Sequence, residues 1–342
     1  MGRLLFGMLI LPTIWAGCNF PEPRGEGEPP DVDTLALLNA QILSSPLEAD
    51  GYAARAEFHL RRGEIGLALE DLELVVQADS TRIEERHRLG QLRFDVRDFE
   101  GAVREWKGVL NVNTNHTPTL LSLARVDVLL RAYEPALKRI NAALQVDSRL
   151  DEAYFLKGRL YLETGDTSKA ASSFQTASEV NPDRYDAFIQ LGLLRATAHD
   201  DLALEYFRTA RSLRPQSIEA LYDEAIYLQE HAKNDTGRYT LALNLYDRIL
   251  DLDNANASAA FNKGYIYLEY LADYGQAESW FKKAISRLPQ YHQAHYNLGL
   301  AIESQGRSQE ALEAYDAALV IDPAYTPAAI AKGRILSGSQ PN

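Results

Sequence analysis

Small residues recur along the chain in two series that follow a unit of about 34 residues. The first series is Ala56, Gly90, Ala124, Gly158, Gly192, Ala225, Gly264, Gly299 and Gly333. The second is Ala68, Ala102, Ala136, Ala170, Ala203, Ala242, Ala277 and Ala311. Each alanine of the second series precedes the next member of the first by 22 residues, whereas the reverse spacing varies from 11 to 17. Because small residues let two helices approach closely, this pattern predicts stacked helix pairs in which only the turn inside a pair varies in length.

The other residues of these units carry a family resemblance. The unit 292–325 contains Leu298-Gly299, Ala311, Tyr315, Ala318 and Pro323. The unit 151–184 contains Tyr154, Gly158, Tyr161, Ala170, Phe174, Ala177 and Pro182. In period and residue type these units resemble the tetratricopeptide repeat. The resemblance covers about residues 49–325 and implies an all-α fold, a solenoid in which helix-turn-helix repeats form a right-handed superhelix.

The resemblance also implies a domain organisation. Eight repeats are expected at residues 49–82, 83–116, 117–150, 151–184, 185–217, 218–256, 257–291 and 292–325. A terminal repeat would otherwise expose a core face, so we expect capping helices within residues 32–48 and 326–342. The sixth unit has 17 residues between Ala225 and Ala242. We expect the excess, around residues 231–237, to be a polar surface loop whose shortening by five residues leaves the fold intact.

The N-terminus is typical of a targeting segment. Arg3 precedes an apolar run, residues 4–15, which is too short to span a bilayer and ends in Ala16-Gly17-Cys18. These residues resemble a bacterial lipoprotein signal peptide, residues 1–17. The resemblance implies that Cys18 is lipidated and that Asn19 favours the outer membrane, at its periplasmic face or at the cell surface. Residues 18–31 are rich in proline, glycine and glutamate and are expected to form a tether. The alternative is an ordinary secretory signal with a chance cysteine.

Composition and motifs limit the partners, metal sites and enzymatic activities that the chain could have. The net charge of -13 disfavours nucleic acid as a partner. With Cys18 as the single cysteine, an intrachain disulfide and a thiolate zinc site are excluded. His292 and His295 could share a metal, but no third ligand stands near them in the sequence. The chain has no G-x-S-x-G, H-E-x-x-H or phosphate-loop motif, and no large segment after the repeats to resemble a sugar-transferase domain. We therefore expect no catalytic residues, no metal, no cofactor and no enzymatic activity.

The candidate binding residues come from the family resemblance, in which positions five and nine of the first helix of each repeat line an inner groove. The predicted partner-binding residues are Phe155, Tyr222, Phe261, Tyr265, Tyr296, Leu300, Arg125 and Arg159. Position two is often acidic, as in Asp50, Glu84, Glu152, Asp186 and Glu219. This surface suits a peptide or an amphipathic helix that carries lysine or arginine beside its apolar residues. Alternatively, these side chains pack on neighbouring helices or are covered by the chain's own termini.

Together these features predict a non-enzymatic protein–protein interaction scaffold, anchored to a membrane of the bacterial cell envelope through Cys18. Two alternatives remain open at this point. One is an envelope enzyme with an unrecognised site on the concave face. The other is a structural lipoprotein that associates with itself.

Overall fold

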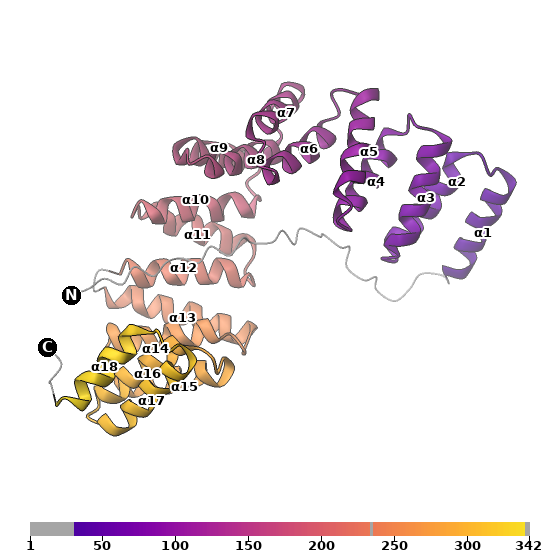
Figure 1. Cartoon of the computed structure of the whole chain (residues 1–342). Coiled ribbons are helices and arrows are strands. Elements are labelled where there is room, and N and C mark those ends of the chain that lie inside the picture. The colour runs from indigo at the N-terminus through magenta and orange to yellow at the C-terminus, as the bar shows by residue number, and fades with distance from the viewer. Residues whose placement is uncertain (1–30, 233–234, 339–342) are drawn as a thin grey trace. The chain divides into compact units, whose positions relative to one another are not determined.

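The computed structural model describes residues 31–232 and 235–338. These residues form 18 α-helices and no strand (Figure 1). None of the described helices is long and apolar enough to cross a membrane. The predicted signal peptide, residues 1–17, and Cys18 lie outside the described residues, as does almost all of the tether at residues 18–31.

The helices follow one another with short connections. The first is α1 (Asp31–Ser44) and the last is α18 (Thr326–Leu336). Between them lie α2 (Ala49–Arg61), α3 (Ile65–Ala78), α4 (Ile83–Asp95), α5 (Phe99–Val112), α6 (Thr117–Leu129), α7 (Tyr133–Val146), α8 (Asp151–Glu163), α9 (Thr167–Val180), α10 (Tyr185–Thr197), α11 (Leu202–Leu213), α12 (Ile218–Glu230), α13 (Thr236–Leu252), α14 (Ala257–Glu269), α15 (Tyr274–Arg287), α16 (His292–Glu303) and α17 (Ser308–Ile321). We call the first helix of each expected repeat helix A and the second helix B.

The chain divides into two compact units, Met1–Leu123 and Ala124–Asn342. The division falls inside α6, which the sequence places as helix A of the third repeat. The first unit contains α1 to α5, and the second contains α7 to α18. Each unit is described by itself below.

A glycine on helix A and a ring on helix B form the recurring core contact. At Gly158, an added methyl group would lie only 2.6 Å from the ring of Phe174, which is completely buried. The same close pairing joins Gly90 to Trp106, Gly192 to Phe207, Gly264 to Phe281 and Gly299 to Tyr315. Glycine is therefore required here because the ring occupies the space of a side chain, which explains why the small-residue series is so regular.

The turn between helices A and B places one residue in the left-handed backbone region. Gly63, Gly165 and Gly306 adopt this conformation with φ of 72°, 80° and 79°. At the equivalent place the chain also uses Arg97, with φ of 68°, and Arg131, with φ of 58°. A residue with a side chain that adopts a positive φ costs about 1 kcal/mol or more. The tight turn is therefore kept in these two repeats although they lack a glycine there.

The sixth repeat departs from the expected surface loop. Helix α13 begins at Thr236 and spans 17 residues, so part of the excess length extends a helix. Ala232 is only 2% exposed and Tyr239 only 4%, and the Tyr239 ring stacks on Tyr270 at 4.4 Å between centroids. The excess is therefore only partly a loop, because Thr236 and the residues after it are helical and Tyr239 packs on the neighbouring repeat; that five residues can be removed without loss stays a prediction.

Candidate partner-binding surface

The predicted partner-binding residues all belong to the second unit, on α6, α8, α12, α14 and α16. Helix A of one repeat contacts helix A of the next where α10 meets α12 and where α14 meets α16. Equivalent positions on such helices therefore lie on one face of the stack, as the sequence predicts.

Phe155 and Phe261 are core residues and not exposed side chains of that face. Phe155 is 6% exposed, its ring lies 5.4 Å from that of Phe174, and the guanidinium of Arg184 sits 4.5 Å from its centroid. Phe261 is 5% exposed and stacks on Tyr291 at 4.9 Å. The expectation that both rings are available to a partner is corrected here: neighbouring helices and an arginine cover them, as the packing alternative supposed.

Four of the predicted residues, Tyr222, Tyr265, Tyr296 and Leu300, are half-buried, and we call them the tyrosine stripe. Tyr222 accepts a hydrogen bond of 2.8 Å from the buried amide of Asn262. The Tyr265 ring lies 6.3 Å from Phe261, and the Tyr296 ring 5.5 Å from Tyr325. Burial raises the pKa of all three tyrosines, so their phenols stay protonated and uncharged. The stripe thus presents ring surface with neutral hydroxyl groups.

The two predicted arginines interact with carboxylates of the chain itself. Arg125 donates a 2.7 Å hydrogen bond to Glu152, which also accepts one of 2.6 Å from Arg184. Burial would raise the pKa of Glu152, but the charges of Arg184 and Arg125 outweigh it and hold that pKa below its ordinary value. Burial lowers the pKa of Arg159, with Glu163 opposing it. Arg125 therefore links neighbouring repeats.

Most of the acidic positions that were expected to attract a basic partner are already satisfied. Asp50 pairs with Arg82 at 2.6 Å. Glu84 lies 3.2 Å from His116, and Glu219 accepts a 2.9 Å hydrogen bond from the hydroxyl of Tyr185. Of the five acidic residues, Glu152 is paired and partly buried, whereas Asp50, Glu84, Asp186 and Glu219 are exposed. Four of these carboxylates thus also contact a group of the chain itself, while four of the five stay accessible to solvent.

Two carboxylates that the sequence reading missed stand near the stripe. Asp223 is partly buried beside Tyr222; burial, reinforced by Glu219, raises its pKa to about 7. Burial also raises the pKa of Glu269 on α14, the helix that carries Tyr265. The sequence shows only that Glu219 and Asp223 are four residues apart and share one face of a helix; the burial that raises the pKa of Asp223 comes from the surrounding structure.

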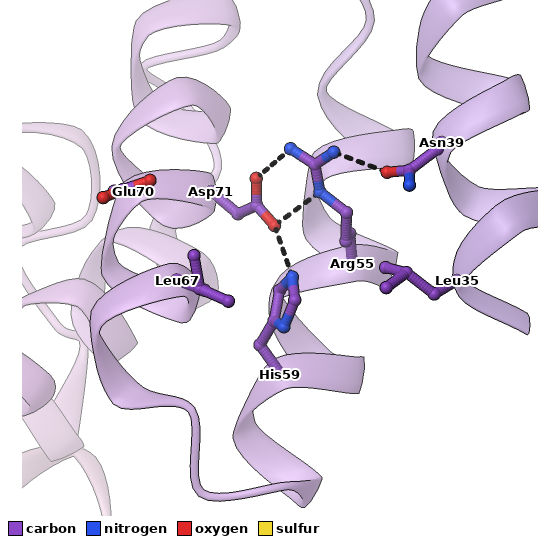
Figure 2. A pocket seen from close by; sticks show the side chains of 7 residues that line it. All are labelled: Leu35, Asn39, Arg55, His59, Leu67, Glu70 and Asp71. Carbon is purple, nitrogen blue, oxygen red and sulfur yellow. Dashed lines mark hydrogen bonds and ion pairs between the residues drawn. The ribbon is translucent and has the colours of Figure 1, made fainter. Parts of the chain in front are cut away.

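A second candidate lies in the first unit, where a cavity of about 240 Å³ opens between α1, α2 and α3 (Figure 2). Asp71, only 2% exposed, receives hydrogen bonds of 2.9 and 2.6 Å from Arg55. Arg55 also donates to Asn39 on α1, and His59 lies 2.7 Å from Glu64. These charged groups satisfy one another, so the cluster joins three helices. Within residues 31–232 and 235–338, no three histidine, cysteine or carboxylate side chains converge on a possible metal position.

Two stretches of the chain match models of the tetratricopeptide repeat family, residues 151–184 and 268–326. Among solved structures, the chain is similar to the C-terminal part of a repeat-containing protein from Cytophaga hutchinsonii. The TM-score is 0.60 at 17% identity, over 72% of this chain and 98% of that one. A tetratricopeptide repeat protein from Parabacteroides merdae gives a TM-score of 0.50 at 19% identity, over 74% and 98% of the two chains. The expected fold class, an all-α solenoid of tetratricopeptide repeats, is confirmed.

Curated relatives share the repeats within larger proteins. The chain is 28% identical over 201 residues to anaphase-promoting complex subunit 3 of Schizosaccharomyces pombe, covering 58% of this chain and 29% of that protein. It is 26% identical over 239 residues to the human protein O-mannosyl-transferase TMTC3, covering 67% and 25%. The chain thus spans less than a third of either relative. One is named as a complex subunit and the other as a transferase, while the shared repeats are generally non-enzymatic scaffolds that bind proteins or peptides.

Proposed function

We propose that this protein is a non-enzymatic scaffold of the bacterial cell envelope that is anchored through a lipid on Cys18 and binds a segment of another protein along the tyrosine stripe. The observation that carries the proposal is the half-burial of Tyr222, Tyr265, Tyr296 and Leu300 on successive helices A. A stripe of partly exposed rings on a stacked scaffold is a surface that a partner can desolvate.

The chemistry of the stripe defines its partner. Aromatic side chains offer a large contact area with few rotatable bonds, and they are enriched among residues that dominate binding energy. Asp223 and Glu269 add carboxylates beside the rings, and Asp186 is exposed on α10. A peptide or amphipathic helix with apolar residues flanked by lysine or arginine complements this surface in shape and charge.

The binding proposal is tested by crosslinking in the native envelope. A photoreactive residue replacing Tyr265 should capture a defined partner, whereas the same residue at the exposed Glu313 on α17 serves as the control. The double substitution Tyr265→Ala, Leu300→Ala should reduce recovery of that partner about tenfold or more. Equal capture from both positions, or wild-type recovery by a folded double variant, would contradict the proposed surface.

Anchoring is tested separately at Cys18. Several acyl chains give stable membrane attachment, whereas a protein without them is released. We expect Cys18→Ala to move the protein from the membrane to the soluble periplasmic fraction and to abolish incorporation of labelled palmitate. Cys18→Ala protein that still takes up the label and sediments with membranes would overturn the lipid anchor without affecting the stripe.

A further inference from the structure

Two histidines from neighbouring repeats meet at the turns of the fifth and sixth repeats. His199 lies in the turn between α10 and α11, and His231 directly follows α12. Nδ1 of His199 lies 3.0 Å from Nε2 of His231, and the two ring centroids are 5.2 Å apart. Both residues belong to the second unit. Because they are 32 residues apart in the sequence, helix periodicity gives no sign that their nitrogen atoms converge.

His231 is held in one orientation and one tautomer. Its Nδ1 atom lies 3.1 Å from the backbone carbonyl oxygen of Tyr227, which can only accept a hydrogen bond. The Nδ1 atom therefore carries a proton, and in the neutral ring the free lone pair is on Nε2. The ring of Tyr227 stacks on the imidazole at 4.2 Å between centroids. A histidine that binds a metal is typically oriented in the same way, by donating its other ring N–H to a carbonyl or carboxylate oxygen.

His199 occupies a turn position at which two other repeats have glycine. Its φ of 53° lies in the left-handed region, as do the φ angles of Gly63 and Gly165 in the equivalent turns. A side chain in this conformation costs about 1 kcal/mol or more, so a histidine here lowers stability relative to glycine. The side chain is exposed to solvent. A neutral imidazole can carry its proton on Nε2, and Nδ1 of His199 then offers a second lone pair without any change in net charge.

We propose that His199 and His231 together bind one divalent transition-metal ion, Ni²⁺ or Cu²⁺, which joins the fifth and sixth repeats and takes water as its other ligands. Imidazole nitrogen is a suitable ligand for both ions, which accept right-angled, tetragonal coordination. Two nitrogen atoms that each lie about 2.1 Å from an ion, at a right angle, are about 3.0 Å apart. The observed separation of 3.0 Å agrees with this geometry. Asp200 and Asp201, which follow His199, instead accept hydrogen bonds from an arginine and a tyrosine side chain.

Nickel chloride is the probe, and the full-length protein is used without a polyhistidine tag. We expect isothermal titration calorimetry to show one Ni²⁺ ion bound per chain, and no binding of Mg²⁺, which prefers oxygen ligands. His199→Gln and His231→Gln should each weaken binding about tenfold or more, because one of the two ligands is lost. His295→Gln is the matched control, because His295 is a half-buried histidine whose Nε2 atom contacts the backbone carbonyl of Pro289. With Cu²⁺ as the probe, electron paramagnetic resonance should show two imidazole nitrogen ligands.

The outcomes separate a shared site from binding at a single exposed histidine. Binding of one ion that is weakened in His199→Gln and His231→Gln but retained in His295→Gln, with all variants folded by circular dichroism, supports the proposal. Absence of saturable Ni²⁺ binding, or wild-type affinity in either of the first two variants, overturns it. A spectrum of bound Cu²⁺ with one imidazole nitrogen also overturns it, since a single histidine then holds the ion. The site is separate from the tyrosine stripe and does not depend on it.

Discussion

The two units differ in the side chains at the centre of their repeats, although buried ion pairs between helices occur in both. In the first unit, ion pairs cross between helices A and B: Asp71 binds Arg55, and Glu105 binds Arg86 at 3.1 Å. Among residues 34–123, Trp106 at 1% exposure is the most deeply buried ring, followed by Phe58 at 3%. In the second unit, a ring occupies the centre of nearly every repeat, and these rings are Phe174, Phe207, Tyr246, Phe281 and Tyr315.

Ion pairs and buried rings contribute differently to the free energy of folding. A buried ion pair loses solvation that its attraction only partly restores, so it defines geometry more than it adds free energy. A buried ring removes a large apolar area from water and also packs on its neighbours. We therefore expect the first unit to be the less stable one. The fluorescence of Trp106 reports on the first unit and that of Trp280 on the second. Each is observed in a chain in which the other tryptophans are replaced by phenylalanine.

The largest effect is expected from removing a central ring of the second unit. Phe281 is fully buried, faces Gly264 and lies 5.6 Å from Phe261. Phe281→Ala should lower the free energy of unfolding by about 3–5 kcal/mol, because it leaves a cavity that glycine cannot fill. Trp280 fluorescence during urea unfolding measures this change in the free energy of unfolding. A loss below 1 kcal/mol would show that the ring stack is not what stabilises this unit.

The ion pair of the first unit should behave differently. Asp71→Leu alone should cost about 3 kcal/mol, because Arg55 is left without its carboxylate. Adding Arg55→Met should recover most of that loss, since an apolar pair of similar volume replaces the charges. Trp106 fluorescence during urea unfolding follows both variants. If the double variant is as unstable as Asp71→Leu, the pair contributes net stability and the contrast between the units fails.

The helical extension of the sixth repeat tests how far the aromatic core reaches. Tyr239 is nearly buried and stacks on Tyr270. Tyr239→Ala should cost about 2 kcal/mol, whereas Thr240→Ala, at an exposed neighbouring position, should change stability by less than about 0.5 kcal/mol. Thermal unfolding of both variants measures the difference. Equal melting temperatures would support the prediction that this segment is dispensable.

The smallest effect is a pH dependence at Asp223. Its folded-state pKa, raised to about 7, lies above the unfolded value, so the folded protein binds more protons between about pH 4 and pH 7. Stability from this group is complete below the unfolded pKa and is lost as the pH rises through 7. Asp223→Asn should therefore stabilise the protein by about 1 kcal/mol at pH 8, after allowance for solvent screening, and by little at pH 4. The melting temperature of the variant is compared with that of the wild type at both pH values. If Asp223→Asn shifts it equally at pH 4 and pH 8, the effect does not come from ionisation of Asp223.

Much of the fold could be read from the sequence because its cause is local. The 22-residue spacing between an alanine of helix B and the next small residue of helix A reflects a stack that cannot change length. The sequence also placed Tyr222, Tyr265, Tyr296 and Leu300 on the first helices of successive repeats, since position in a repeat determines which face a side chain shares. Asp223 was missed because its raised pKa depends on the burial that surrounding helices impose.

The sequence by itself determined the all-helical repeat, its period and the small-residue positions at which helices approach closely, because helix periodicity and residue size act over a few turns. Only the tertiary structure decided which of these residues a partner could reach. Phe155 and Tyr296 stand at the same repeat position, yet one is 6% exposed under Arg184 and the other is half-buried. Exposure is a property of neighbouring helices, and a repeat pattern does not specify which neighbours are present.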